Sequence, residues 1–351
     1  MSAAGKVRVL LVEDSDTQRE VLAWVIRKAP NLELVGEATN GREAVEMVRA
    51  LRPDIVLMDC HMPVMDGVAA TREIMQECPV PILIVSASAA ASDVHPGLDA
   101  MREGALAIVP KPIDPGAASF ESQAEELRLN LRLMSEVQVV RRRPRRTAPT
   151  FHARERSHPA ISLIAIGAST GGPPAVMEIL RASAGCLKVP VLIVQHMAPG
   201  FSTGFASWLS RASGVPVSIA VDRETARPGC AYVAPDDYHL GIDRLYRLRL
   251  DQGPPEDGFR PSVSYLFSNV ADTFGAKAMA ILLTGMGEDG ARGLADVARA
   301  GGVTVAQNKE TSVVFGMPGV AVRMGAARHV LTPSEIADLV VEQMTQRSVQ
   351  A

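Results

Sequence analysis

Short β-branched runs alternate with amphipathic helical segments over the first 136 residues of the chain. In the segments from Gln18 to Lys28 and from Gly41 to Arg49, apolar residues recur at the spacing of one helix face. This alternation is typical of a doubly wound parallel sheet. It predicts an α/β domain of the (βα)5 type, with strands at residues 7–12, 32–38, 55–58, 82–86 and 106–109.

The alternation stops between residues 139 and 159. This stretch contains the basic run RRRPRR, from Arg141 to Arg146, followed by scattered Pro, Ser and His residues. We interpret it as a solvated linker rather than as a contact with an anionic surface. The pattern therefore predicts an α/β domain at residues 1–136, a basic flexible linker at 137–160 and a further domain at 161–351.

In the third part the alternation resumes, which predicts a second doubly wound, Rossmann-like α/β domain. Its apolar runs predict buried strands at residues 161–166, 189–195, 279–283 and 303–306. Residues 231–250 depart from this pattern, because turn residues such as Pro235, Asp236 and Gly241 separate very short strands there. We expect an insertion of antiparallel β-hairpins at that point.

Composition narrows the class of protein. The length of 351 residues suits two domains at about 150 residues each, and 47% hydrophobic with 21% charged residues is typical of a globular soluble chain. A formal net charge of −3 argues against bulk nucleic-acid binding.

No secretory signal or apolar run of about 20 residues is present, so we expect a cytoplasmic protein. The four cysteines lack metal-site spacing, which predicts reduced thiols.

Polar residues follow four of the five predicted strands of the first domain. Glu13 and Asp14 end the first strand, Asp59 the third, Ser86 the fourth and Lys111 the fifth. Because the carboxyl ends of parallel strands meet at one edge of a sheet, these side chains are expected to converge. Three carboxylates repel one another unless a hard cation such as Mg²⁺ lies among them. Helix capping would explain one acidic residue but not this whole set.

The motifs VEDS, MDCHMPVMDG, VSAS and PKP resemble those of response-regulator receiver domains, which have a flavodoxin-like fold. The resemblance implies that Asp59 accepts a phosphoryl group from a histidine kinase. It also implies that Glu13 and Asp14 hold Mg²⁺ with Asp59, and that Ser86 and Lys111 contact the phosphoryl oxygens. Many receivers carry an aromatic residue three positions before the lysine. Here that residue is Ile108, so the switch mechanism is left open.

A serine on a glycine-rich turn begins the second domain. The run GASTGG places Ser169 between a predicted strand and a predicted helix at residues 173–181, where a sharp turn exposes the hydroxyl and the helix N-terminus favours negative charge. The run lacks the lysine of a Walker loop and the second glycine of a dinucleotide fingerprint. It is thus typical of a nucleophilic serine.

Two other strand ends supply partners for this serine. His196 follows the next apolar strand, where it could take the proton from Ser169, and Asp289 follows the strand at 279–283, where it could orient the imidazole. His239 is an alternative base and Glu288 an alternative acid. For the oxyanion we expect backbone N–H donors, at Thr170 and in the Gly285–Gly287 loop at Met286.

The motifs IGASTGGPPAV, VLIVQHMAPGF, RPSV and LLTGMGEDGA resemble the chemotaxis protein-glutamate methylesterases, the CheB family, and the order of receiver, linker and hydrolase matches the whole chain. The resemblance implies that Ser169, His196 and Asp289 form a catalytic triad with no cofactor in the hydrolase site. It implies as substrates the γ-methyl glutamates on the cytoplasmic helices of chemoreceptors, with deamidation of glutamines there.

Two other classes of function fit the sequence less well. A receiver that gates a catalytically inactive binding module would not need the three triad residues together. A transcriptional regulator would need a recognition helix and a basic face, and the C-terminal half shows neither.

Overall fold

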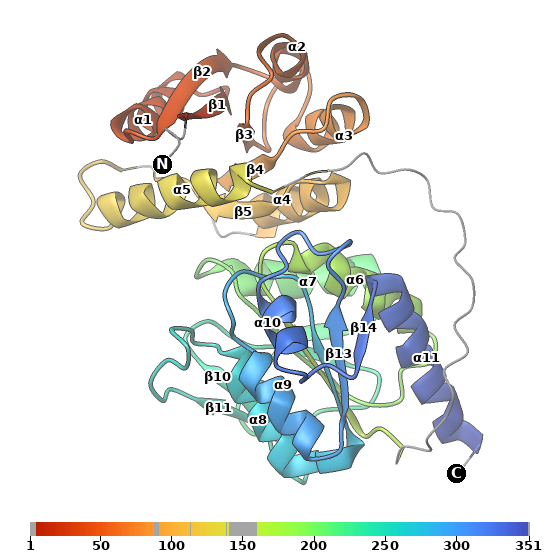
Figure 1. The fold of residues 1–351 in the computed structure, drawn as a ribbon. Coiled ribbons are helices and arrows are strands. Elements are labelled where there is room, and N and C mark those ends of the chain that lie inside the picture. The colour runs from red at the N-terminus through yellow and green to blue at the C-terminus, as the bar shows by residue number, and fades with distance from the viewer. Residues whose placement is uncertain (1–4, 88–90, 113, 138, 140–159, 350–351) are drawn as a thin grey trace. The chain divides into compact units, whose positions relative to one another are not determined.

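The computed structural model describes residues 5–87, 91–112, 114–137, 139 and 160–349. The chain forms two compact units, residues 1–147 and 148–351 (Figure 1), and each has its own parallel sheet. The basic run from Arg141 to Arg146 lies outside the described residues, so the predicted linker and the predicted domain boundaries stay predictions.

The first unit is a five-stranded parallel sheet in the order β2-β1-β3-β4-β5. Its central strands are buried, as expected where helices cover both faces. Helices α2, α3 and α4 pack successively against one another, and α1 packs against α5. The elements are β1 Val7–Val12, α1 Asp16–Lys28, β2 Leu32–Ala38, α2 Gly41–Leu51, β3 Ile55–Asp59, α3 Gly67–Glu77, β4 Ile82–Ser86, α4 Ala91–Glu103, β5 Ala107–Pro110 and α5 Phe120–Ser135.

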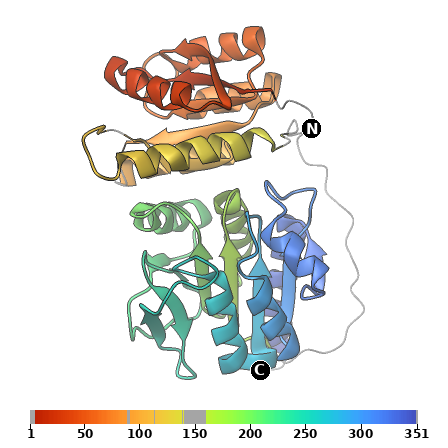
Figure 2. The ribbon, with the colours of Figure 1, turned by 60° about the vertical axis from the view of Figure 1, so that its left-hand side comes forward.

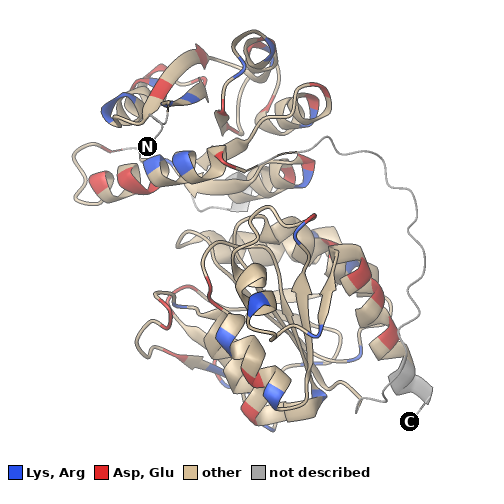
Figure 3. Cartoon of the chain, viewed as in Figure 1, with Lys and Arg blue, Asp and Glu red and all other residues tan. Residues whose placement is uncertain are grey.

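Side-chain caps and charges define the helices of this unit. Helix α1 begins at Asp16 rather than at the predicted Gln18, because Ser15 caps it and accepts from the Gln18 amide. Asn40 caps α2 in the same way. Figure 3 shows acidic residues toward the start of α5 and basic residues toward its end, an order that the helix dipole favours.

The second unit is a seven-stranded parallel sheet in the order β14-β13-β12-β6-β7-β9-β8 (Figure 2). Strands β6, β7, β12 and β13 are buried throughout, which confirms the apolar runs read as buried strands. The elements are β6 Leu163–Ala168, α6 Gly172–Ser183, β7 Val191–Gln195, α7 Phe201–Ser213, β8 Val217–Ile219, β9 Ala231–Val233, β10 His239–Ile242, β11 Leu248–Asp251, α8 Val263–Phe274, β12 Ala278–Leu282, α9 Ala291–Arg299, β13 Val303–Gln307, α10 Met317–Arg323, β14 His329–Leu331 and α11 Pro333–Val349, with a short 3₁₀ helix at Gly275–Lys277.

The expected hairpin insertion is only partly correct. Strands β10 and β11 pair antiparallel and form a separate two-stranded sheet, as predicted. Strand β9, however, joins the main sheet and runs parallel to both β7 and β8. The reason is burial: all three residues of β9 are apolar or aromatic and fully covered, so the strand belongs to the core.

Two further expectations from composition can be compared with the structure. Cys60, Cys78, Cys186 and Cys230 are all free, as predicted, and burial raises the pKa of the Cys60 thiol to about 12. Among the described helices, none is both long and apolar enough to cross a membrane.

Candidate functional site

The polar residues predicted at the strand ends of the first unit do converge. Glu13 and Asp14 follow β1, Asp59 ends β3, Ser86 ends β4 and Lys111 follows β5, and these strands are neighbours in the sheet. Ser86 and Lys111 are also joined through the backbone, since the Lys111 amide donates to the Ser86 carbonyl at 2.8 Å.

Lys111 links the buried carboxylates. Its Nζ lies 2.8 Å from Oε2 of Glu13, at an angle outside that of a hydrogen bond, and 3.2 Å from Oδ1 of Asp59. It also donates to Oε1 of Gln18 at 2.8 Å, a contact that the sequence analysis missed. Burial raises the pKa of Glu13 above its usual value, against the opposing effect of the nearby Lys111 ammonium group.

The carboxylates outnumber the ammonium group. One oxygen each from Glu13, Asp14 and Asp59 lies within 4.8 Å of the others, and Asp14 is exposed while its neighbours are buried. One lysine cannot balance three carboxylates, so the cluster has an excess of negative charge and carboxylate oxygens of the kind that Mg²⁺ binds. The donor set therefore fits this ion.

In the second unit, Ser169 lies on the turn between β6 and α6. Its amide donates to the Thr284 carbonyl at 3.0 Å, and its carbonyl accepts from the Gly172 amide at 2.8 Å. Gly171 has a left-handed backbone with φ of 76°, and a Cβ there would collide with Val313. The glycine thus permits the sharp turn that presents the serine.

His196 follows β7, the neighbour of β6. Its amide donates to the Ala168 carbonyl at 2.9 Å, which places it beside the serine turn. Its Nε2 lies 2.9 Å from Oδ2 of Asp289, although the ring N–H direction departs from that of an aligned hydrogen bond. Catalytic hydrogen bonds often align only once the substrate is bound. Nδ1 is buried and has no hydrogen-bond partner among the described residues.

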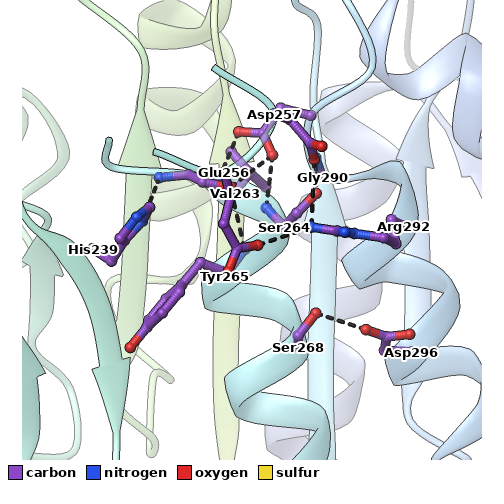
Figure 4. Close-up of polar contacts among 12 residues, drawn as sticks. His239, Glu256, Asp257, Val263, Ser264, Tyr265, Ser268, Gly290, Arg292 and Asp296 are labelled. Atoms are coloured by element: carbon purple, nitrogen blue, oxygen red, sulfur yellow. Dashed lines mark hydrogen bonds and ion pairs between the residues drawn. The ribbon is translucent and has the colours of Figure 1, made fainter. Parts of the chain in front are cut away.

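Asp289 is buried beside the N-terminus of α8. Its Oδ1 accepts from the Ser262 hydroxyl at 2.9 Å and from the Ser264 amide at 2.9 Å, and its Oδ2 accepts from the Val263 amide at 2.7 Å. Figure 4 shows Val263 and Ser264 at this helix start. Burial alone would raise the pKa of Asp289, but the close contact with the His196 imidazole, together with these amides, lowers it to about 2.

The two backbone donors expected for an oxyanion lie on loops that meet at Ser169. A Cβ built on Gly285 would lie only 2.7 Å from the Ser169 Cβ, so the loop that carries Met286 passes directly beside the serine. Among the described residues, no acceptor binds the amide of Thr170 or of Met286. Both amides are therefore free to donate to a ligand.

Comparison with known proteins agrees with this geometry. A family model described as CheB methylesterase matches residues 164–340, and one described as response regulator receiver domain matches residues 9–118. The protein-glutamate methylesterase/protein-glutamine glutaminase 3 of Hahella chejuensis is 45% identical over 350 residues, 97% of this chain and 99% of its own.

The chain belongs to the CheB methylesterase family.

Further comparisons support the family for each unit. Protein-glutamate methylesterase/protein-glutamine glutaminase 1 of Syntrophus aciditrophicus is 46% identical over 345 residues, 96% of this chain and 98% of its own. The crystal structure of the Thermotoga maritima CheB methylesterase catalytic domain, 36% identical, matches with a TM-score of 0.51 over 52% of this chain and 98% of that one. The fold is thus a flavodoxin-like receiver followed by a CheB catalytic domain.

In this CheB chain the alternative base, His239, and the alternative acid, Glu288, lie in different surroundings from His196 and Asp289. His239 is buried, its Nδ1 accepts from the Ser262 amide at 3.2 Å, and its Nε2 lies 3.1 Å from the Pro254 carbonyl. Both ring nitrogens are therefore engaged by backbone. Glu288 is exposed, whereas Asp289 is buried against the imidazole.

Three groups at the CheB site had not been identified from the sequence. Gln195 donates through Nε2 to the carbonyls of Ser169 at 2.8 Å and His196 at 2.9 Å, and so ties the two turns together. The α8 N-terminus holds Asp289, and Ser262 before an apolar run is a recognisable cap signal for that helix. Phe259 stacks on His196, and no sequence pattern indicates that contact.

Proposed function

We propose that the second unit hydrolyses methyl esters of glutamate side chains on the cytoplasmic helices of chemoreceptors, with Ser169 as nucleophile, His196 as base and Asp289 as the carboxylate that orients it. The observation that carries this assignment is the buried His196–Asp289 pair at 2.9 Å beside the serine turn. The names of the relatives support the substrate class, and their second activity extends the proposal to glutamine amides.

The reaction begins with proton transfer. Because Nε2 of His196 faces Asp289, Nδ1 is the nitrogen left to take the proton from the Ser169 hydroxyl. The serine oxygen attacks the ester carbonyl, and Asp289 stabilises the imidazolium that forms. Its pKa of about 2 keeps it ionised at neutral pH.

The negative oxygen of the tetrahedral intermediate then needs donors, for which the amides of Thr170 and Met286 are free. Collapse of the intermediate expels methanol, which takes its proton from His196. Water attacks the acyl-enzyme in the same way and releases the glutamate carboxylate. A glutamine amide would follow the same steps with ammonia as the leaving group.

We further propose that phosphorylation of Asp59 by a histidine kinase regulates this activity. Glu13, Asp14 and Asp59 would hold Mg²⁺, which neutralises the charge of the incoming phosphoryl group. Lys111 and Ser86 would contact the phosphoryl oxygens. The excess of carboxylates over cationic side chains in this cluster supports the assignment.

The decisive experiment measures methanol release from methylated chemoreceptor membranes by the wild type and by Ser169→Ala. A triad serine supplies a factor of about 10⁶ in rate, so the variant should release no methanol above background. Ser218→Ala, an exposed serine of β8, is the matched control and should keep the wild-type rate. If the wild type releases no methanol, or if Ser169→Ala does, the esterase proposal is wrong.

Acetyl phosphate tests the regulatory half in the same assay. It should stimulate the wild type and Asp16→Asn, whose exposed side chain lies off the acidic cluster, but not Asp59→Asn. Chelation of Mg²⁺ should also abolish stimulation and leave basal release intact. Full stimulation of Asp59→Asn would place the regulatory site elsewhere.

A further inference from the structure

One aromatic side chain covers the proposed base. The ring of Phe259 stacks on the imidazole of His196, with centroids 4.0 Å apart and planes 6° apart. Phe259 itself is 37% exposed, whereas both imidazole nitrogens are buried. The phenyl ring therefore keeps part of its own surface in water while it shields the imidazole.

Phe259 belongs to a loop of residues 252–261, between β11 and α8, which we name the covering loop. Glu256 and Phe259 exchange backbone hydrogen bonds of 3.1 and 2.9 Å across a two-residue turn. The turn residues Asp257 and Gly258 are both left-handed, with φ of 52° and 84°, as an Asp-Gly type I′ turn requires. The two hydrogen bonds of this turn fix the direction in which the backbone presents Phe259.

Both ends of the covering loop are tied to His239. Its Nδ1 accepts from the amide of Ser262, just after the loop, and its Nε2 lies 3.1 Å from the carbonyl of Pro254 within it. The His239 ring is fully buried and stacks on Tyr265 of α8 at 4.5 Å. Figure 4 shows His239 and Tyr265 side by side. The residue that had been considered as a rival base thus anchors this loop.

Arginines hold the loop on its two sides. Arg260 donates to the Gln252 and Gly253 carbonyls at 3.1 and 2.9 Å, and to Asp237 at 3.1 Å. From α9, Arg292 lies 2.9 Å from Glu256 (Figure 4). Exposed ion pairs stabilise little, but here they join the loop to elements on either side and so restrict where Phe259 can lie.

We infer that Phe259 is a positioning residue for the reaction: held by the covering loop, it keeps the His196 ring in one orientation and stabilises the imidazolium through its π face. The inference rests on the proposed function, because it assigns His196 as the base. An aromatic face attracts a cation within about 6 Å of its centroid, and an imidazole that acts as the base becomes positively charged when it takes the serine proton. The contact therefore favours the transition state over the ground state.

The kinetic test compares substitutions that keep or remove the ring. Phe259→Ala and Phe259→Leu should lower kcat for methanol release by about tenfold. This is the effect expected when one cation–π contact is removed and the His196 ring is no longer held in one orientation. Phe259→Tyr and Phe259→Trp should retain the wild-type kcat, because both keep an aromatic face against His196 at a partly exposed position. KM should change little in all four. Leu245→Ala, on the exposed turn between β10 and β11, is the control.

Chemical modification tests the same contact without substrate. Diethyl pyrocarbonate should carbethoxylate His196 slowly in the wild type and several-fold faster in Phe259→Ala, as followed by peptide mass spectrometry. If the wild type releases no methanol, the proposed esterase function is wrong, whatever the rates at which His196 is carbethoxylated. The positioning role is overturned if Phe259→Ala keeps both the wild-type kcat and the slow modification, or if Phe259→Leu matches the wild type in kcat.

Discussion

The two sites of this chain differ in how the charge of their buried carboxylates is balanced. Each lies at the carboxyl edge of a parallel sheet, and each has a buried carboxylate beside a basic nitrogen: Glu13 beside Lys111, and Asp289 beside His196. In the first unit, three carboxylates share one ammonium group. In the second unit, one carboxylate has the imidazole and three further donors.

The pKa values follow this difference. Burial raises the pKa of Glu13, whereas the donors around Asp289 overcome burial and lower its pKa to about 2. The acidic cluster is thus incomplete without an added cation, which suits a site that is switched by a phosphoryl group. In the second unit the partners of the buried carboxylate all come from the chain itself, which suits catalysis by fixed dipoles that need no reorganisation.

Among the variants that test this comparison, Asp289→Asn is expected to have the largest effect. An amide cannot accept from both backbone N–H groups and stabilise an imidazolium, so kcat should fall by about 10⁴ while the unit stays folded. Methanol release measures the rate, and circular dichroism checks the fold.

The matched control is Glu288→Gln, which removes one carboxylate from the next residue. Glu288 is exposed, so its loss should leave kcat within about threefold, as for most surface changes. A large loss in Glu288→Gln together with a small one in Asp289→Asn would reverse the assignment of the acid and break the comparison.

A second test uses pH. The folded pKa of Asp289, about 2, lies below its ordinary value of 3.8, so its stabilisation is complete above the ordinary value and is lost as pH falls through the folded one. The contribution is about 2 kcal/mol, and about half of it should be lost by pH 3. Urea unfolding at pH 6 and pH 3 measures this decline.

The non-titrating variant Asp289→Asn supplies the reference for that measurement. Between pH 6 and pH 3 the wild type should lose about 1 kcal/mol more than the variant, because only the wild type carries the depressed carboxyl group. Equal losses would show that Asp289 is not held in its charged form by the folded protein.

The same contrast explains how far the sequence could predict each site. In the first unit every polar residue of the cluster directly ends or follows a strand, so strand periodicity alone placed Glu13, Asp59 and Lys111 together. In the second unit that rule places Ser169 and His196. The rule is weaker for Asp289, because this residue lies seven residues beyond β12. Its neighbour Glu288 was therefore an alternative for the acid.

The contacts that could not be predicted from the sequence depend on packing between elements far apart in the chain. The donors to Asp289 come from α8, a helix 25 or more residues away in the chain, and hydrophobic periodicity does not report which loops meet. The sequence pattern predicts β9 as part of a hairpin, because three residues are too few to show a period. Its burial between β7 and β8 identifies it as a strand of the main sheet. Phe259 was missed for the same kind of reason.

The smallest expected effect concerns backbone strain in the loop after β3. Val64, in the loop after β3, has a left-handed backbone with φ of 67° and is 85% exposed. A β-branched residue in this region costs about 1–2 kcal/mol, and almost no packing offsets it here. Val64→Asn should therefore stabilise the first unit by about 1 kcal/mol, because asparagine tolerates this conformation. Hydrogen exchange of β1 and β3 amides in the full chain measures it.

Val221→Asn separates strain from the loss of an exposed apolar side chain. Val221 is 60% exposed in the second unit and is not among the described residues with positive φ, so its substitution should change stability by less than about 0.5 kcal/mol. If both variants stabilise their units equally, the gain at Val64 comes from polarity and not from backbone strain. If only Val64→Asn stabilises, strain is stored in the loop after β3, and strain of this kind is characteristic of segments that change conformation in function.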